Sequence, residues 1–322
     1  MNHWGQSPNL VSNATVRIQM SYLQAIVLGI LQGVTELFPI SSLGHGVLIP
    51  ALLGWHNLVG AQTRSESFYL AFLVGLHVGT AIALLIFYRK TWVKVIGGFF
   101  SSVQERSIAK PDQRLAWLLI IGTIPVGIIG LAFEHKLRLL FTKPLAASIF
   151  LTINGVILLI GELVRRSSKS NAQRMAASRG RHAPGASTLS IQGASQQLES
   201  LSLGRGLVIG TSQVLALFAG ISRSGVTMVT GIFSGLDEED AAQFAFLLAT
   251  PVILLAGLYK LPDLLGPNGN GIRGQCIVGT IAAGIAAYLS VKFLVRWFQS
   301  HSLWPFAIYS LVVGGLCIAY FA

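Results

Sequence analysis

Charged side chains are scarce in this chain of 322 residues: Asp, Glu, Lys and Arg together make up 11% of it, against 52% hydrophobic residues. Soluble globular domains carry roughly 25% charged residues, so the composition excludes an ordinary soluble protein. Only two cysteines occur, Cys276 and Cys317, and both lie in apolar stretches. This argues against a disulfide framework and a cysteine metal site. The sequence therefore predicts an integral membrane protein.

Long apolar runs dominate the sequence instead. A helix needs roughly 20 apolar residues to cross the ~30 Å hydrocarbon core of a bilayer. Six runs qualify and predict an all-α fold with six full transmembrane helices, at about 68–88, 115–133, 144–164, 240–259, 274–295 and 304–321. Four shorter apolar pieces form two pairs, 21–38 with 43–54 and 206–220 with 225–235. Because a polar break joins each pair, we interpret them as two re-entrant helix hairpins, 21–54 and 206–235.

Each break holds one solitary charged residue. Glu36 stands in the otherwise uncharged segment 18–63, and Arg223 stands in the otherwise uncharged segment 206–236. Non-helical backbone at membrane depth survives only where it is buried in protein or faces water, so the breaks predict a lined cavity. Charges inside membranes usually mark functional sites. Two simpler interpretations stay open: the breaks are loops outside the membrane, or the two charges only form a structural ion pair.

The distribution of Lys and Arg and an internal repeat predict how the halves are arranged. Lys and Arg favour the cytoplasmic side of a membrane, and both are frequent after the first and third full spans. This distribution predicts that hairpin 21–54 enters the membrane from outside. Hairpin 206–235 is then expected to enter from the cytoplasm. At a shift of 181 residues, Gly29, Gln32, Ile40, Ser41 and Gly44 match Gly210, Gln213, Ile221, Ser222 and Gly225. These observations predict an inverted repeat around a central site, with repeats 18–166 and 204–322.

The remaining segments are polar. We expect residues 1–17 to form a polar N-terminal tail. Residues 167–203 are rich in Ser, Gln, Arg and Ala, a composition that predicts a disordered basic cytoplasmic linker. The basic character of this linker accounts for the net charge of +11. We expect its positive charge to attract anionic lipid head groups. Because the basic linker lacks interleaved aromatic residues, we expect no nucleic-acid partner.

The first break contains the parts of an activated nucleophile. Ser41 and Ser42 follow Pro39 at the expected start of a half-helix, where free N–H groups attract anions. His45 lies three residues beyond Ser42, so the two side chains share a helix face, and Glu36 is close in sequence. A hydroxyl near an imidazole and a carboxylate is typical of nucleophilic catalysis. Capping alone is the simpler role for the serines.

The second break predicts a phosphate-binding site. Ser222, Arg223 and Ser224 stand at the expected start of another half-helix, and Thr227 follows one turn after Arg223. The donor fork of arginine suits phosphate oxygens and stays charged when buried. Three polar residues isolated within spans are interpreted as hydrogen-bonding partners between helices rather than site residues: His77, Asn154 and Gln243.

Two motifs resemble a known family. The run Gln32-Gly-Val-Thr-Glu36-Leu-Phe-Pro39-Ile-Ser41-Ser42-Leu-Gly44-His45, followed by Gly220-Ile-Ser222-Arg223-Ser224-Gly225-Val-Thr227, closely resembles the undecaprenyl-diphosphate phosphatases of the bacitracin-resistance type. The likeness extends from about residue 21 to Pro305-Phe306-Ala307-Ile308-Tyr309. It implies two interlocked inverted repeats in the bacterial inner membrane.

The resemblance also implies an activity. The enzyme would hydrolyse undecaprenyl diphosphate to the monophosphate and inorganic phosphate, recycling the lipid carrier for peptidoglycan synthesis and conferring bacitracin resistance. A polyprenyl diphosphate lipid is then the substrate, a divalent cation (Mg²⁺ or Ca²⁺) is the cofactor, and Glu36 is a candidate metal ligand. We expect an active site that faces the periplasm. A homo-oligomer stays open.

The resemblance suggests a mechanism for the two breaks. The diphosphate would lie between the half-helix starts, held by Ser41 and by a second group of residues: Ser222, Arg223, Ser224 and Thr227. Ser42 would attack phosphorus and Glu36 or His45 would take its proton, while His45 as the nucleophile is the main variant. Charge on the phosphoryl oxygens must be stabilised, so Arg223 is expected to matter most to the rate.

This chain departs from the family pattern at three positions of the motifs. Gln32 stands where many members carry the first glutamate of an E-x-x-x-E pair, although the family also accepts Gln there. Gln32 therefore has a supporting role, and the case for a two-carboxylate metal site is weaker. Leu43 replaces a threonine, and Ala219 replaces a proline.

Two other classes of function share features with this sequence. A secondary transporter or lipid flippase would also suit broken helices in inverted repeats. A phosphatase of the acid-phosphatase superfamily fits poorly, because Val229 stands where its motif needs histidine.

Overall fold

The computed structural model describes residues 20–55, 58, 68–140, 143–180, 198, 201–266 and 271–322. Within these ranges the regular elements are helices, and no strand occurs among them. The first half contains α1 (Tyr22–Thr35), α2 (Ser42–Leu52), α4 (Phe68–Phe87), α5 (Arg89–Glu105), α6 (Pro111–Leu140) and α7 (Pro144–Gly180). The second half contains α9 (Leu203–Ser212), the 3₁₀ helix η1 (Gln213–Leu217), α10 (Arg223–Phe233), α11 (Glu238–Leu265), α12 (Arg273–Trp297) and α13 (Trp304–Phe321).

Five helices in the described part of the chain are long and apolar enough to cross a membrane. Their candidate spans are Pro111–Phe133, Pro144–Ser167, Glu238–Pro262, Arg273–Trp297 and Trp304–Phe321, and each contains one predicted span. The sixth predicted span, 68–88, falls on α4, which meets α5 at a bend of 86°. The structure thus confirms an all-α, multi-pass integral membrane protein.

Helix α7 continues beyond its predicted end. The prediction of disorder was wrong for residues 167–180, because α7 is helical as far as Gly180. This stretch contains Ala, Arg, Met, Lys and Gln, which favour helix, and no proline. A polar composition limits burial without preventing helix formation. The rest of the predicted linker up to residue 200, apart from Leu198, and the predicted tail 1–17 lie outside the described residues.

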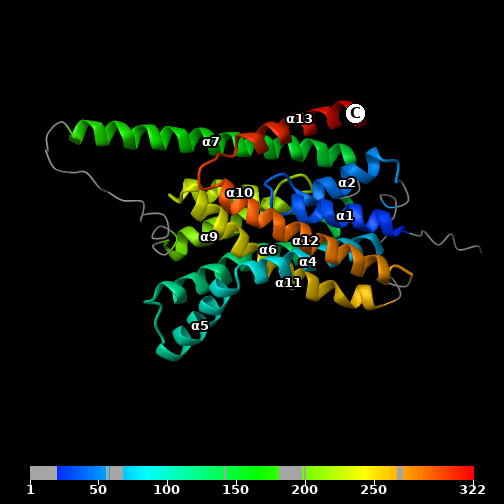
Figure 1. The fold of residues 1–322 in the computed structure, drawn as a ribbon, viewed down its shortest axis with the longest axis horizontal. Coiled ribbons are helices and arrows are strands. Elements are labelled where there is room, and N and C mark those ends of the chain that lie inside the picture. Colours follow the sequence, from blue (N-terminus) through cyan, green and yellow to red (C-terminus); the bar gives the residue numbers. More distant parts are fainter. Residues whose placement is uncertain are drawn as a thin grey trace, which may run out of the picture.

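The short helices of the two halves lie toward opposite ends of the molecule. Figure 1 shows the long helices running largely along the long axis, with α1 and α2 toward one end of it and α9 and α10 toward the other. Helix α1 packs against α12, and α9 packs against α6. Each half therefore inserts its first short helix against a long helix of the other half.

Two glycines permit these contacts. A Cβ atom added to Gly29 in α1 would collide with the backbone oxygen of Gly279 in α12, and one added to Gly210 in α9 would collide with the backbone of Gly122 in α6. Only glycine allows helix backbones to come this close. Gly29 and Gly210 are also equivalent at the 181-residue shift, so the sequence identity has a common structural cause.

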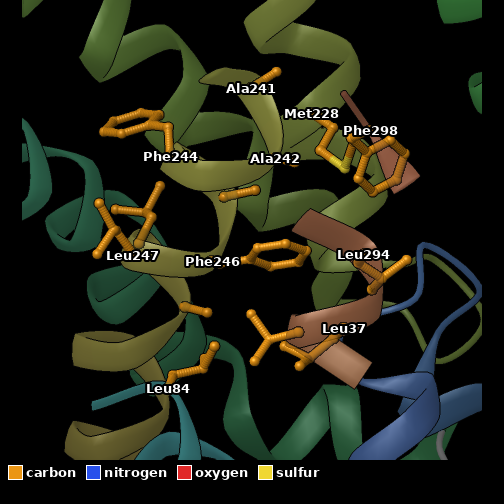
Figure 2. Packing of buried hydrophobic residues seen from close by; sticks show 14 of the residues in the cluster. Leu37, Leu84, Met228, Ala241, Ala242, Phe244, Phe246, Leu247, Leu294 and Phe298 are labelled. Atoms are coloured by element: carbon orange, nitrogen blue, oxygen red, sulfur yellow. The ribbon is translucent and has the colours of Figure 1, made fainter. Parts of the chain in front are cut away.

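A large buried cluster holds the first break in place. Leu37, which directly follows Glu36, is fully buried with Phe246 of α11 and Leu294 of α12 (Figure 2). Met228 of α10 and Phe298 belong to the same cluster. Because the first break and helix α10 contribute residues to one packed core, the polar groups beside them are held at fixed positions relative to each other.

Candidate active site

The first break is a turn between α1 and α2. Glu36 caps the end of α1, and Ser41 caps the start of α2 by accepting a hydrogen bond from the Gly44 N–H at 3.2 Å. Ser41 has a φ of 71°, in the left-handed region that non-glycine residues rarely adopt. Its carbonyl oxygen accepts from the His45 N–H at 3.2 Å. These bonds hold the strained residue in place.

The second break repeats the capping hydrogen bond, but its cap residue Ser222 has an ordinary extended backbone with a φ of −84°. Ser222 caps α10 by accepting from the Gly225 N–H at 3.2 Å, and its hydroxyl lies 3.0 Å from that of Ser224. Gly220 has a φ of 116°, and a Cβ atom there would collide with the backbone of Ala147 in α7. The turn requires glycine for both reasons.

Hydrogen bonds join the two breaks directly. The Gly220 N–H donates to Ser41 Oγ at 3.1 Å. Asn154 of α7, which is fully buried, donates from Nδ2 to the Pro39 carbonyl at 2.9 Å and accepts at Oδ1 from the Ser222 N–H at 2.9 Å. The structure thus brings the two breaks into one buried site.

The Glu36 carboxylate is the centre of this site. Its Oε1 atom pairs with Arg223 Nη2, and its Oε2 atom accepts from the Ser42 hydroxyl. Oε2 also accepts from Gln32 Nε2 at 3.0 Å and lies 3.3 Å from His77 Nε2. The Glu36 side chain is only 6% exposed, so a buried charge is surrounded by donors from three helices and the second break.

Free donors remain beside this carboxylate. Arg223 Nη1 is buried and has no hydrogen-bond partner in the described part of the structure. At the start of α10, the backbone N–H groups of Arg223 and Ser224 also have no partner within the described residues. A buried donor without a partner costs free energy, and an anion at a helix N-terminus would satisfy it. The site therefore suits a phosphate oxygen.

His45 is engaged away from Ser42. Its Nδ1 atom lies 2.7 Å from the Ser41 carbonyl oxygen, which only accepts, so Nδ1 carries a proton. Its Nε2 atom lies 2.7 Å from the Tyr309 hydroxyl, and the two rings stack at 5.7 Å. Of the two proton acceptors considered for Ser42, Glu36 is the one in contact.

Thr227 is turned toward its own helix. Its hydroxyl donates to the Arg223 carbonyl at 2.7 Å and lies 3.0 Å from the Ser224 carbonyl. It is thus buried beneath the start of α10, with its proton already used. Ser41, Ser222 and Ser224, in contrast, lie at the facing ends of the two breaks.

A comparison with known families identifies the family of this chain. The family model described as bacitracin resistance protein BacA matches residues 25–316. The chain belongs to the BacA family. Two relatives are named undecaprenyl-diphosphatase 2 from Frankia alni, 53% identical, and undecaprenyl-diphosphatase from Mycolicibacterium paratuberculosis, 50% identical. Each comparison covers 94% of this chain, with 99% and 98% of the relatives respectively.

The residues of this BacA-family chain do not fit a protein-held metal ion at Glu36. Both carboxylate oxygens already accept from protein donors, and Gln32 offers no second negative charge. No group of three or more His, Cys, Asp or Glu side chains suited to a metal occurs among the described residues. Divalent cations prefer several carboxylate or carbonyl oxygens, which this site does not offer.

Two site residues of this BacA-family chain were missed by sequence reasoning. His77 contacts Glu36, and Asn154 joins the two breaks, whereas both were expected only to link helices. Gln243 lies elsewhere, beside a surface pocket lined by Lys94, Asp112 and Asp240. The only local signal for His77 and Asn154 is a polar side chain in an apolar span, which Gln243 shares.

Proposed function

We propose that this chain hydrolyses undecaprenyl diphosphate to undecaprenyl phosphate and inorganic phosphate, recycling the lipid carrier of peptidoglycan synthesis. The observation that carries this function is one buried cluster in which the Ser42 hydroxyl bonds to Glu36 while Arg223 keeps a free Nη1 donor. Membership of the BacA family and the names of the relatives support it.

The diphosphate binds between the starts of α2 and α10. Arg223 Nη1 and the free N–H groups at the start of α10 donate to the oxygens of the terminal phosphoryl group. Hydroxyl groups of Ser222 and Ser224, which lie 3.0 Å apart, complete the cradle. A divalent cation used in the reaction arrives on the diphosphate, because Glu36 and Gln32 do not fit one.

Ser42 is the nucleophile of the first step. Its oxygen attacks the terminal phosphorus and its proton passes to Glu36 Oε2, while the bond to the bridging oxygen breaks and undecaprenyl phosphate leaves. Glu36 gives this proton to the leaving undecaprenyl phosphate and is again a base. In the second step water attacks the phosphoserine and gives a proton to Glu36, which passes it to Ser42 Oγ as the bond from Oγ to phosphorus breaks and inorganic phosphate leaves. Arg223 stabilises the charge on the phosphoryl oxygens in both steps.

The two hairpins form an inverted repeat in the bacterial inner membrane. The bounds of α10 are those of α2 moved by 181 residues at both ends, which supports the repeat. Six spans follow if α4 and α5 count as one broken span. Arg89 and Lys90 follow α4 and Arg166 lies near the cytoplasmic end of the α7 span, so α1 and α2 enter from the periplasm, toward which the site faces.

Phosphate release from undecaprenyl diphosphate by the detergent-purified protein tests this function. Arg223→Ala should lower the rate by about 10³-fold or more, since a charge-stabilising arginine contributes this much to phosphoryl transfer. Arg296→Ala, an exposed arginine at the end of α12, is the control and should keep the wild-type rate. Full activity in Arg223→Ala would remove the site assignment, and lipid flux without hydrolysis would favour a flippase.

A further inference from the structure

The Glu36 carboxylate is surrounded by polar side chains of the protein. Arg223 faces Oε1, and Ser42, Gln32 and His77 face Oε2. Three of these contacts keep the carboxylate in place before any substrate arrives, while Ser42 is the group that reacts.

His77 is the unexpected member of this set. Its Nδ1 atom lies 2.7 Å from the Leu73 carbonyl oxygen, one turn earlier in α4, and its Nε2 atom lies 3.3 Å from Glu36 Oε2. Carbonyl and carboxylate oxygens only accept, so both ring nitrogens face acceptors. An imidazole meets two acceptors without repulsion only when both nitrogens carry protons. Both contacts are favourable together when the His77 ring is the doubly protonated, cationic form.

We propose that His77 takes the place of a divalent cation at Glu36, as a positioning residue for the Ser42–Glu36 pair. With Gln32 in place of a second carboxylate, this helix face carries one negative charge instead of two. The cations His77 and Arg223 neutralise it and leave a net positive site for the phosphate. The side chains of His77 and Glu36 are 18% and 6% exposed, so solvent screens their attraction little.

Manganese binding to the substrate-free protein tests this directly. Electron paramagnetic resonance should detect no Mn²⁺ bound tightly to the wild-type chain. The double variant Gln32→Glu/His77→Gln should gain one Mn²⁺ per chain, because two carboxylates then share a helix face at a spacing of four residues, the cation at Oε2 is gone, and Arg223 at Oε1 balances only one of the two negative charges. The matched control, Gln24→Glu/His301→Gln, makes the same exchanges outside the site and should gain none. Thermal unfolding in detergent checks that both variants fold.

Activity gives a second readout. His77→Gln keeps a hydrogen-bond donor but removes the charge, and should lower kcat about 10- to 100-fold while KM changes much less. His77→Lys restores the charge and should recover part of the loss. A histidine with only a packing role would give Lys no advantage over Gln.

The kinetic test of His77 rests on the proposed function, whereas the Mn²⁺ test does not, so failure of the role of His77 and failure of the function give different results. Tight Mn²⁺ binding to the wild-type protein that Glu36→Gln abolishes would overturn it, and so would a folded double variant that binds no Mn²⁺. Unchanged kcat in His77→Gln would also overturn it. A chain that hydrolyses no undecaprenyl diphosphate would disprove the proposed function, and the Mn²⁺ measurements would still decide the role of His77.

Discussion

Helices α2 and α10 begin in the same way, and the residues that follow their caps differ. Ser41 and Ser222 each accept a hydrogen bond from the glycine N–H three residues later, at 3.2 Å in both cases. The next position holds Ser42, the proposed nucleophile, in the first break and Arg223 in the second. The capping hydrogen bond is thus repeated, although φ is 71° at Ser41 and −84° at Ser222, while the chemistry is divided.

This division explains why the site needs both halves. At the 181-residue shift Glu36 falls on Leu217, so the second break brings a buried cation without its own carboxylate. The first break has the carboxylate and the hydroxyl but no arginine. A buried charge is stable only when it is paired. Each half therefore compensates the other, and the reactive groups meet only in the folded protein.

Removing one serine hydroxyl from each break should give the largest difference between the two breaks. Ser42→Ala should lower phosphate release by at least about 10³-fold, because loss of a nucleophile removes the covalent pathway. Ser224→Ala removes one phosphate donor and should cost about tenfold. Steady-state kinetics on undecaprenyl diphosphate measure both. Equal losses in the two variants would show that the breaks are chemically equivalent.

A rapid-quench experiment identifies the nucleophile independently. With a substrate labelled in its terminal phosphate, the wild-type protein should carry label that survives acid, as phosphoserine does. Ser42→Ala should carry none. Label lost in acid would instead indicate phosphohistidine and would assign the attack to His45, against its contacts with Ser41 and Tyr309.

Asn154 offers a way to separate the breaks without changing their reactive groups. Asn154→Ala leaves the Pro39 carbonyl and the Ser222 N–H without this partner, and each such buried group costs about 1–3 kcal/mol. Small misplacements of reacting groups cost up to about 10²-fold in rate, so activity should fall about 10- to 100-fold. Thermal unfolding in detergent and phosphate release measure the two effects.

Thr152→Val is the control for this change. Thr152 lies two residues earlier in α7, and its hydroxyl donates within that helix to the Ser148 carbonyl at 3.0 Å. The variant should keep nearly full activity. If Asn154→Ala behaved like Thr152→Val, the two breaks would be held together by packing alone.

The sequence predicts the parts of this site better than their pairing. Spans and breaks follow from composition and length, which are local properties, so 274–295 was recognised within α12. Glu36 and Arg223 were found because each stands alone in an apolar segment. Their contact joins positions 187 residues apart, and the structure shows that they meet.

The contacts of His77 and Asn154 were not predictable in the same way. A lone polar residue in a span has no sequence pattern that shows which helix it faces, and Gln243 would have been an equal candidate. His77 reaches Glu36 because α4 lies beside α1, and Asn154 reaches both breaks because α7 contacts α2 and α10. The end of α7 was missed for another reason, since polar residues with good helix propensity resemble a linker.

The smallest expected effect tests whether the two halves share a scaffold. Gly29→Ala and Gly210→Ala each place a methyl group against the backbone of a helix from the other half, at Gly279 and Gly122. Overpacking of this kind costs about 1–3 kcal/mol, which thermal unfolding in detergent would detect as a lowered Tm in both variants. A Cβ atom at Gly127 of α6 meets nothing within 4 Å, so Gly127→Ala should leave Tm unchanged or raise it.

Because the close contacts of Gly29 and Gly210 lie outside the reactive cluster, the activity of the folded Gly29→Ala and Gly210→Ala variants should stay near wild type. A large loss in one variant alone would mean that only one of the two short helices depends on close packing, and the structural equivalence of the halves would then stop at their caps.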